Sequence, residues 1–494
     1  MQQTTASHVT ADPARKASLG QFFTPAPVAD FMASLFNLTS NTVDLLDAGS
    51  GEGALTEAFV RSLTNRRSRP KRINVTAYEL DPAMIQPLRA TLSRCHQSCD
   101  AHGIEFSCKV LNEDFVLEAA EMVRGSFFMP LASVFTTAIV NPPYKKIRSD
   151  SITRASLRRA GIETSNLYAG FVALICRLLA PRGELVAITP RSFCNGPYFK
   201  PFRLEFLETM SLRQLHVFDS RSAAFRQDEV LQENVILHAV KGITKPHKIL
   251  ISRSSGEPGD KGIQREVDFE DVVSPNDGER FIRLLTEDQH ACVNTSMERF
   301  EESLDDLGLG VSTGRVVDFR ARSFLRMQPS NDTVPLIYPC HFRDGYIDWP
   351  MDNRRKPSAL LDDERTRELQ VPSGVYVLTK RFTAKEERRR IVACIYDPDR
   401  ISAKSVGFEN HLNYFHSSGA GIPLRLAKGL TLFLNSSLVD TYFRQFSGHT
   451  QVNATDLRGL RYPSREALEH LGDKVEGVGQ PQEKLDHLIA AELF

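Results

Sequence analysis

The feature that most constrains the fold is an alternation of short apolar runs with longer helical patterns from Leu19 to about Val240. Parallel strands need crossover connections, and a helix between successive strands provides them. The pattern therefore predicts an α/β fold built on a parallel, doubly wound, Rossmann-like sheet. The expected strands and helices, in chain order, are Val43–Asp47, Ala54–Leu63, Ile73–Tyr78, Pro82–Cys95, Phe106–Val110, Ala138–Val140, Leu167–Leu179 and Glu184–Ile188. Leu215–Phe218 and Val235–Val240 follow with only a polar loop between them, which predicts a hairpin that closes one edge of the sheet.

A length of 494 residues is too great for one compact core, because single cores stop growing at about 250–300 residues. The segment Ser252–Gly262, rich in Gly, Pro and Ser, breaks every periodic pattern and marks the expected domain boundary. We expect a flexible segment over residues 1–18, a first domain over 19–250 and an α+β domain over 263–494. The elements expected in the second domain are strands at Leu336–Tyr338, Val375–Thr379 and Ile391–Tyr396 and a helix over Leu430–Phe443.

Composition excludes several classes of protein. No stretch approaches the roughly 18–20 continuous apolar residues that cross a bilayer, and the N-terminus lacks a signal-peptide core, so a cytoplasmic protein is expected. The eight cysteines are scattered through apolar segments, which predicts reduced core thiols. Cys95 and Cys99, with His96 and His102 nearby, lack a second ligand pair, so no metal site is expected. The balance of 61 basic against 61 acidic residues excludes a histone-like polycation but does not describe how the charge is distributed.

A glycine-rich turn joins the first strand to the first helix in the sequence Leu45-Leu46-Asp47-Ala48-Gly49-Ser50-Gly51-Glu52-Gly53. Alternate glycines let the backbone approach a ligand closely, and the helix that follows offers free N–H groups at its N-terminus. Gly49, Gly51 and Ala54 also satisfy a loose dinucleotide-binding pattern. Asp47, at the strand end, suits instead a cationic ligand such as S-adenosylmethionine. A strand–helix turn that binds nothing is the third alternative.

Acidic residues stand at the ends of the next two expected strands. Glu79 is placed for bidentate hydrogen bonds to a ribose diol, whereas Asp81, directly before Pro82, is expected to cap a helix. Asp114 and Phe115 follow the third strand and are candidates for binding the amino group and the face of an adenine ring. Taken alone, Asp114 fits an ordinary loop acid better.

The sequence Asn141-Pro142-Pro143-Tyr144 ends a strand with two prolines, which stop the ladder and fix a stiff turn. An amino group on a planar ring is a poor nucleophile because its lone pair is delocalised. The Asn141 side-chain carbonyl and the Pro142 backbone carbonyl can accept its two hydrogen bonds and localise that lone pair. Tyr144 can stack on the face of the base and hold it in register. An accidental turn is the alternative interpretation.

In this order the motifs resemble those of the gamma group of adenine-N6 DNA methyltransferases of type II restriction–modification systems, of the PstI/BsuBI methylase type. In that family a Phe-Thr-Pro motif precedes the glycine turn, the catalytic motif follows it, and a target-recognition domain comes last. The segments that carry the resemblance are Gly20-Gln21-Phe22-Phe23-Thr24-Pro25, Asp47–Gly53, Glu79, Asp114-Phe115, Asn141–Tyr144, Ile188–Phe193 and Phe446–Asn453.

The resemblance implies S-adenosylmethionine as cofactor, an S-adenosylmethionine-dependent methyltransferase sheet and a role for each matching residue. Thr24 would contact the methionine part beside Asp47, Gly49 and Gly51. Glu79 would hold the ribose, and Asp114 and Phe115 the adenine. The target adenine would be held by Asn141, Pro142, Pro143 and Tyr144. A second aromatic that packs on the flipped base is matched to Phe225, with Phe218 as competitor.

The second domain is expected to bind double-stranded DNA, because an adenine inside a duplex must be extruded at a cost of a few kcal/mol to reach such a pocket. The run Tyr376–Arg390 carries six basic residues against two acids, and Lys380 and Arg381 within it are candidates for phosphate contacts. A solvated hairpin is an equally good explanation of that run. The polar segment Ser447–Asn453 adds candidate DNA contacts at His449, Thr450 and Asn453.

The predicted activity is transfer of a methyl group from S-adenosylmethionine to N6 of adenine at a specific duplex site. The predicted setting is a cytoplasmic monomer that is functionally paired with a restriction endonuclease without a stable complex. Alternatives are methylation of a protein glutamine amide, methylation of ribosomal RNA, an inactive methylase-like binding module and, least favoured, a dehydrogenase.

Overall fold

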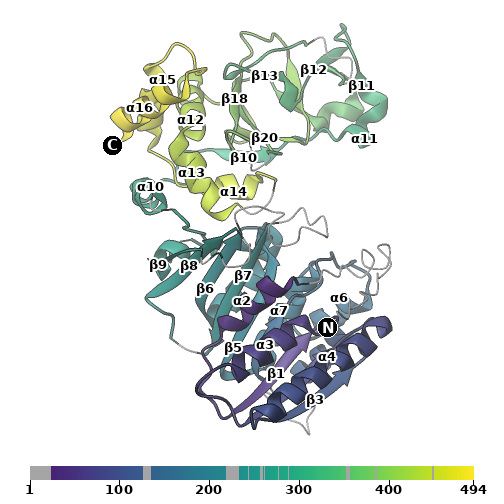
Figure 1. The fold of residues 1–494 in the computed structure, drawn as a ribbon. Coiled ribbons are helices and arrows are strands. Elements are labelled where there is room, and N and C mark those ends of the chain that lie inside the picture. The colour runs from purple at the N-terminus through teal and green to yellow at the C-terminus, as the bar shows by residue number, and fades with distance from the viewer. Residues whose placement is uncertain are drawn as a thin grey trace, which may run out of the picture. The chain divides into compact units, whose positions relative to one another are not determined.

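The computed structural model of the chain describes residues 24–125, 135–218, 233–242, 244–255, 260, 262–275, 277–287, 289–351, 356–383, 387–447 and 450–494. The segment expected to be flexible, residues 1–18, lies outside the described residues. The chain divides into two compact units between Thr286 and Glu287. Figure 1 shows the elements of both units.

Unit 1 is built on one nine-stranded sheet in the order β3-β2-β1-β4-β5-β7-β6-β8-β9. Its first five strands in this order are parallel, and β7 runs antiparallel to both β5 and β6. The strands are β1 (Thr42–Ala48), β2 (Arg72–Tyr78), β3 (Glu105–Leu111), β4 (Phe135–Val140), β5 (Leu179–Pro190), β6 (Met210–Phe218), β7 (Asn234–Lys241), β8 (Lys248–Ser254) and β9 (Ile263–Asp268). The predicted Rossmann-like α/β sheet is confirmed, and every strand and helix predicted before residue 190 is present.

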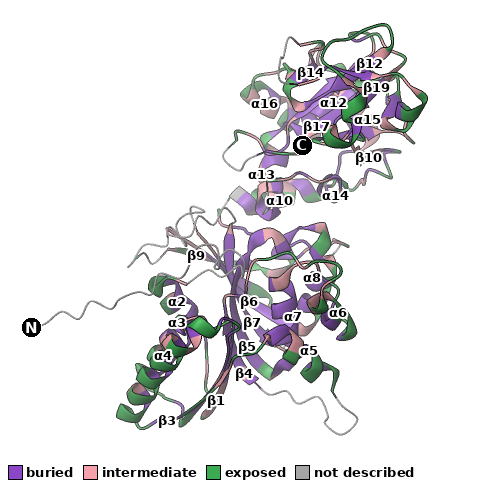
Figure 2. Cartoon of the chain, turned by 90° about the vertical axis from the view of Figure 1, so that its right-hand side faces the viewer, coloured by how far each residue is buried: buried purple, intermediate pink, exposed green. Residues whose placement is uncertain are grey.

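Helices cover both faces of this sheet, as Figure 2 shows with the sheet seen nearly edge-on. On one face α2, α3 and α4 build a core around Met32, Phe59 and Leu88. On the other face α5, α7 and α8 build a second core around Phe115, Val172 and Phe206. The helices of unit 1 are α2 (Ala26–Ser34), α3 (Ala54–Thr64), α4 (Pro82–Ala101), α5 (Phe115–Arg124), α6 (Ile152–Arg159), α7 (Leu167–Leu178), α8 (Lys200–Thr209) and α9 (Phe269–Val272). Two short 3₁₀ turns, Arg191–Cys194 and Pro197–Phe199, precede α8.

The hairpin expected at the sheet edge is present as β6 and β7, but it does not close the sheet. β8 pairs parallel with β6, and β9 pairs antiparallel with β8. The domain boundary predicted at 252–262 therefore falls between two paired strands inside unit 1, whereas the chain divides into its units between Thr286 and Glu287. Gly and Pro are common both in interdomain linkers and between paired strands, so composition alone could not distinguish the two.

Unit 2 contains two sheets and a helical C-terminal part, which fits the expected α+β class. One sheet has the order β10-β20-β17-β18-β14-β13, and the other has the order β11-β15-β12-β19-β16. Aromatic and aliphatic side chains of both sheets share one core, among them Tyr376, Phe408 and Tyr414. The strands are β10 (Gly310–Thr313), β11 (Leu325–Arg326), β12 (Thr333–Ile337), β13 (Phe342–Arg343), β14 (Tyr346–Ile347), β15 (Ala359–Leu361), β16 (Gln370–Pro372), β17 (Tyr376–Lys380), β18 (Ala393–Tyr396), β19 (Ser405–Phe408) and β20 (Leu412–His416). The helices are α10 (Gln289–Glu298), α11 (Asp318–Ala321), α12 (Leu424–Leu434), α13 (Ser437–Phe446), α14 (Ala454–Arg458), α15 (Arg465–Asp473) and α16 (Gln482–Leu493), and 3₁₀ turns lie at Arg322–Phe324, Pro339–His341 and Glu364–Leu369.

The single helix expected over Leu430–Phe443 is wrong, because the chain breaks there into α12 and α13. Asn435 ends α12, and its side chain exchanges two hydrogen bonds with the backbone of Ala393. Ser436 caps α13 by accepting a hydrogen bond from the amide of Val439. An Asn-Ser pair competes for backbone groups in this way, and that signal for a break was present in the sequence.

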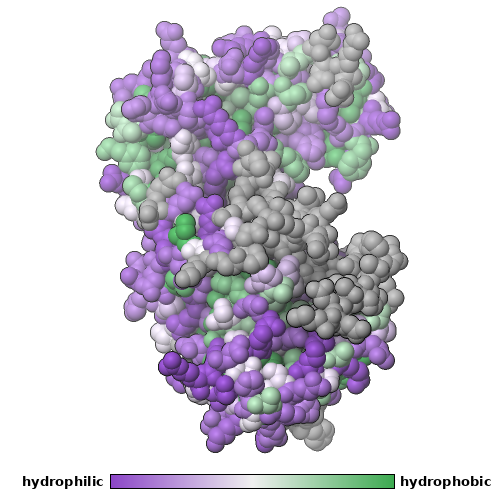
Figure 3. Space-filling view, in the orientation of Figure 1, coloured by the Kyte–Doolittle hydropathy of each residue, from purple (hydrophilic) through white to green (hydrophobic). Residues whose placement is uncertain are grey.

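The described surface is mainly hydrophilic, and Figure 3 shows only small hydrophobic areas on the face it presents. No helix among the described residues is long and apolar enough to cross a membrane. All eight cysteines are free, but Cys108, Cys292 and Cys340 are exposed, so the expectation of core thiols fails for these three.

Candidate functional site

The strand order in the sheet of unit 1 reverses between β1 and β4, and the two predicted motifs meet at this point. From β1 the strand order runs outward through β2 to β3 on one side and through β4 to β5 on the other. The glycine turn follows Ala48 at the carboxyl end of β1, and Asn141 follows Val140 at the carboxyl end of β4. In open α/β sheets, ligands bind in the crevice outside the strand ends at such a switch point.

The glycine turn has the backbone conformation that its composition predicts. Gly49, Gly51 and Gly53 have φ angles of 78°, 56° and 85°, a region that side chains other than glycine rarely occupy. A Cβ atom at Gly53 would lie 2.9 Å from the Leu88 side chain, so this position also has no room for one. The turn therefore passes close against α4 before α3 begins.

Glu79 locks this turn from the end of β2. Its carboxylate is buried and accepts the amide of Gly51 at 2.7 Å on Oε2 and the amide of Asp81 at 2.7 Å on Oε1. Burial raises the pKa of Glu79, and these backbone hydrogen bonds oppose the rise. Asp81 accepts the amide of Ala83 at 2.9 Å and caps α4, as the sequence predicts. Because a carboxylate oxygen can accept more than one hydrogen bond, the contacts of Glu79 with the turn are compatible with a bound ligand.

Asp47 lies behind the turn and does not line the cavity. Its Oδ2 accepts the Thr56 hydroxyl at 2.6 Å, while its buried Oδ1 has no hydrogen-bond partner among the described residues. Burial raises the pKa of Asp47 to about 7, the Thr56 hydrogen bond partly offsets that rise, and the nearby Glu79 carboxylate adds to it. A buried acid with one unsatisfied oxygen would be stabilised by a cation bound on the cavity side of the turn.

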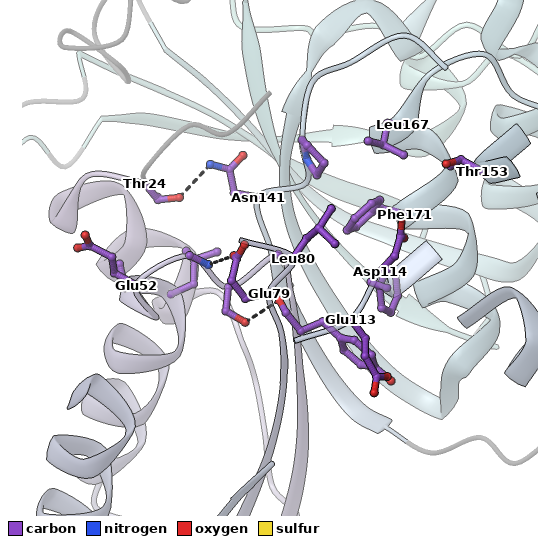
Figure 4. A pocket seen from close by; sticks show the side chains of 18 residues that line it. Thr24, Glu52, Glu79, Leu80, Glu113, Asp114, Asn141, Thr153, Leu167 and Phe171 are labelled. Carbon is purple, nitrogen blue, oxygen red and sulfur yellow. Dashed lines mark hydrogen bonds between the residues drawn. The ribbon is translucent and has the colours of Figure 1, made fainter. Parts of the chain in front are cut away.

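A cavity opens beyond these strand ends, and Figure 4 shows the side chains around it. Sequence reasoning missed Leu80, Thr153, Leu167 and Phe171, which form much of its apolar wall. The Phe171 ring lies 5.0 Å from the Phe115 ring, and the Leu80 side chain is half exposed. Leu80 stands directly between the two predicted acids, so its place in the sequence could have indicated it. The full lining is Thr24, Gly49, Ser50, Gly51, Glu52, Ala54, Leu55, Tyr78, Glu79, Leu80, Glu113, Asp114, Phe115, Asn141, Pro143, Thr153, Leu167 and Phe171.

Asn141 and Thr24 come together in this cavity from distant parts of the sequence of unit 1. The Asn141 amide nitrogen donates a hydrogen bond to the Thr24 hydroxyl at 3.1 Å, which Figure 4 marks. Committing the amide nitrogen to Thr24 presents the carbonyl oxygen as the acceptor of this side chain. Thr24 thus positions Asn141, a contact that the sequence alone did not indicate.

The remaining residues of this motif follow the same turn. Pro142 is buried and Pro143 lines the cavity. The Tyr144 hydroxyl donates to the Ile188 carbonyl at 3.3 Å, and its ring meets Tyr168 edge-on at 6.3 Å. Tyr144 does not itself line the cavity.

Asp114 and Phe115 begin α5 at the rim of the cavity. The Asp114 carboxylate caps this helix by accepting the amides of Val116 and Leu117 at 2.9 and 3.4 Å on the same oxygen, Oδ1. Capping and ligand contact are therefore compatible, since its other oxygen is not engaged in this cap. Phe115 is buried between Tyr78 and Phe171 with part of its surface toward the cavity.

Neither candidate for the second aromatic that packs on the base is seen at the cavity among the residues that the structure describes. Phe225 lies outside the described residues. Phe218 ends β6, and its ring packs edge-on against His216 at 5.0 Å without lining the cavity.

In unit 2 the structure brings the two predicted DNA-binding segments side by side. The Val452 amide donates to the Arg381 carbonyl at 2.7 Å, and the Thr383 amide donates to the Thr450 carbonyl at 3.0 Å. His449 lies outside the described residues. Lys380 is half buried above the Phe342 ring, and the Arg381 guanidinium donates to the Asn410 carbonyl at 3.1 Å. Asn453 caps α14 in a reciprocal arrangement with Asp456.

Comparison with known proteins assigns the family. Residues 111–225 match the model of the Eco57I restriction–modification methylases. The type II methyltransferase M.PstI of Providencia stuartii is 44% identical over 99% of this chain and 95% of its own length. The chain belongs to the type II methyltransferases of restriction–modification systems.

A second relative and one solved structure complete the comparison. The type II methyltransferase M.BsuBI of Bacillus subtilis is 42% identical over 98% of this chain and 97% of its own length. A solved structure of the type IIG restriction endonuclease BpuSI aligns with 96% of this chain and 63% of that chain, at 14% identity and a TM-score of 0.44. The family assignment rests on the two full-length methyltransferases.

Proposed function

We propose that this methyltransferase transfers a methyl group from S-adenosylmethionine to N6 of an adenine that is flipped out of duplex DNA. The observation that carries the proposal is the meeting of the glycine turn and the Asn141–Tyr144 motif at the switch point of one sheet. One motif suits a nucleoside cofactor and the other suits a planar amino group, and they open into the same cavity. Membership of a restriction–modification family supports DNA as the substrate.

We infer that the cavity holds S-adenosylmethionine, because its lining offers a candidate partner for each part of that molecule. Glu79 would accept the ribose hydroxyls, and Asp114 and Phe115 would bind the adenine ring beside the apolar wall of Leu80 and Phe171. Gly49 and Gly51 would approach the methionine part, and Thr24 would lie next to it. The unsatisfied oxygen of Asp47 favours a positively charged group in this region. When bound, the sulfonium supplies an activated methyl group, so no strong general base is needed.

The residues around Asn141 would prepare the target amino group. The Asn141 side-chain carbonyl, oriented by Thr24, and the Pro142 backbone carbonyl would accept its two hydrogen bonds. These two hydrogen bonds would draw the N6 lone pair out of conjugation and aim it at the methyl group. The new N–C bond would replace the S–C bond of the sulfonium, whose electron pair stays on sulfur, and one N6 proton would leave to solvent. Tyr144 and Pro143 would fix the plane of the base, and Phe225 would pack on its other face.

Unit 2 would supply the contacts that offset the cost of base flipping. Lys380, Arg381, His449, Thr450 and Asn453 are the proposed DNA contacts, with the cations on phosphates. The Arg381 guanidinium also donates a hydrogen bond to the Asn410 carbonyl. Part of its contribution to DNA binding would therefore come from holding that loop in position. We propose that the protein acts in the cytoplasm as a monomer and shares its DNA site with a restriction endonuclease without a stable complex.

Transfer of a labelled methyl group tests this function. Duplex DNA, ribosomal RNA and a cell extract cleared of nucleic acid are each incubated with the protein and tritiated S-adenosylmethionine. The expected result is incorporation into DNA alone, and Asn141→Ala should reduce its rate by about 100-fold or more because a positioned acceptor is lost. Incorporation of the label into RNA or protein but not into DNA would contradict the proposal. Cofactor binding without any transfer by the intact chain would favour an inactive binding module.

A further inference from the structure

Three loops of unit 2 that are far apart in the sequence meet at one end of its six-stranded sheet. β17 ends and β20 begins at this end, since Lys380 pairs with Leu412 in their antiparallel register. The Arg381 amide donates to the His411 carbonyl at 2.8 Å, and Phe382 forms a β-bridge with Gln451. Segments 381–383, 409–411 and 450–452 therefore form one surface, which we call the β17–β20 tip. Residues 409–411 were not among the DNA-binding candidates that the sequence suggested.

A buried acid fixes the His411 side chain on this tip. Glu409 is fully buried, and its Oε2 accepts the His411 amide at 2.9 Å while its Oε1 pairs with the imidazole Nδ1. A buried carboxylate without a partner costs several kcal/mol. The His411 side chain therefore cannot leave Glu409 without that cost, and this keeps the imidazole in place. The imidazole is nearly half exposed, and with Nδ1 committed to Glu409 its Nε2 edge is the polar group left for a ligand.

An aromatic ring stands next to this fixed imidazole. Phe382 is 41% exposed, although phenylalanine in a soluble protein is usually buried. Its ring lies 4.8 Å from the His411 ring, at an angle of 50°. Arg381 supports the same loop by donating to the Asn410 carbonyl. An exposed aromatic face and an oriented polar edge, both held by rigid strand ends, suit a nucleobase better than a phosphate.

We propose that His411 and Phe382 form a base-reading pair of this enzyme, with Glu409 as the residue that positions it. The proposal rests on the proposed function and adds residues that determine the DNA sequence preference. His411 contacts the edge of a base in the recognition site through Nε2, and Phe382 makes apolar contact with the same or the neighbouring base. Lys380, the last residue of β17 directly before the tip, contacts a phosphate and carries no sequence information.

The test compares two duplexes of equal length at several salt concentrations. One contains the site found by methylation sequencing of DNA from cells that express the chain, and the other contains the same bases scrambled. We expect His411→Ala and Phe382→Ala to weaken binding to the site duplex by about ten-fold, with little change on the scrambled duplex and the same salt slope. Lys380→Ala should weaken binding to both duplexes and flatten the salt slope.

His470→Ala is the matched control, because His470 is also exposed and also pairs with a carboxylate, Glu492 at 3.1 Å, on the helices α15 and α16. It should leave both affinities unchanged. Glu409→Gln should lower the preference for the site duplex while cofactor affinity stays at the wild-type value. An equal loss on both duplexes for His411→Ala, or no loss on either, would overturn the proposal. If the intact chain methylates no DNA at all, the proposed function fails instead, so the two failures are distinguishable.

Discussion

At the scale of single residues, the site combines groups whose burial sets their chemistry. Asp47 is buried behind the glycine turn with a pKa of about 7, and Glu79 beside it has a raised pKa for the same reason, burial. A hydrogen bond to Thr24, which lies 117 positions away in the sequence, sets the orientation of the Asn141 side chain. Each of these groups lines the cavity or lies directly behind it, and each has a measurable consequence if the proposed function is correct.

Cofactor affinity should depend on pH through Asp47. In the free protein this carboxyl is largely protonated below about pH 7, whereas a bound cation favours its ionised form. Binding therefore releases a proton in this range, so the Kd for S-adenosylmethionine should rise by up to about ten-fold per unit as the pH falls below 7 and stay level above it. Calorimetric titration from pH 5.5 to 8.5 measures this profile.

Asp47→Asn should abolish that slope, because the amide does not titrate. Glu113→Gln is the control, since Glu113 is an exposed acid on the rim of the same cavity, and it should leave the slope in place. A slope that survives in Asp47→Asn would assign the proton to another group.

Thr24→Val should damage catalysis more than cofactor binding. Valine has nearly the same shape but accepts no hydrogen bond, so the Asn141 amide is no longer held in one orientation. We expect kcat to fall by about ten-fold or more with a smaller change in the Kd for S-adenosylmethionine. Thr24→Ser keeps the hydroxyl and should retain most of the activity. Equal activity of the Val and Ser variants would contradict the positioning role.

At the scale of elements, the residues of the candidate site follow the carboxyl ends of β1, β2, β3 and β4. In unit 2, contacts between helices hold the C-terminal part together. One of these contacts joins α12 to α15, where a Cβ atom at Gly429 would lie only 1.7 Å from the Leu468 carbonyl oxygen. Gly472 on α15 faces the Arg425 carbonyl in the same way. These two helices therefore touch through their backbones, with glycine required at both positions.

Gly429→Ala should separate α12 from α15 and destabilise unit 2 by about 2 kcal/mol or more, since neither backbone can give way. The expected result is a lower melting temperature together with unchanged cofactor affinity, because Gly429 belongs to unit 2 and the cofactor cavity is built from unit 1 alone. Gly477→Ala, where a Cβ would meet nothing within 4 Å, is the control and should leave the melting temperature unchanged. A wild-type melting temperature for Gly429→Ala would show that the helices can move apart freely.

The sequence was informative wherever local pattern and chemistry coincide. The strand–helix alternation predicted the sheet. The glycines and the Asn-Pro-Pro-Tyr motif indicated a candidate site at one edge of it, because strand ends in a parallel sheet share one edge. Contacts between distant segments were not predictable in this way. Tertiary packing creates the Asn141–Thr24 hydrogen bond, the contact of Phe171 with the cavity and the pairing of Glu409 with His411. The sheet also continues into β8 and β9, although the composition of the segment between these strands fits an interdomain linker equally well.

At the scale of the whole molecule, we propose that the two units divide the work of a type II methyltransferase. Unit 1 holds the cavity and the Asn141 motif, and unit 2 presents the β17–β20 tip. The zero net charge is an average over buried acids such as Glu79 and Asp47 and basic segments such as 376–390. Overall charge therefore gave no indication of the DNA substrate that the local features support.

The proposed function requires that the accepting atom is N6 of adenine. Duplex DNA methylated by the purified protein with S-adenosylmethionine is digested to nucleosides, which are separated and identified by mass spectrometry. We expect N6-methyldeoxyadenosine as the product, with its rate of formation reduced by about 100-fold or more when Asn141→Ala replaces the intact chain. Methylation of cytosine, at N4 or C5, with adenine unmodified would contradict it.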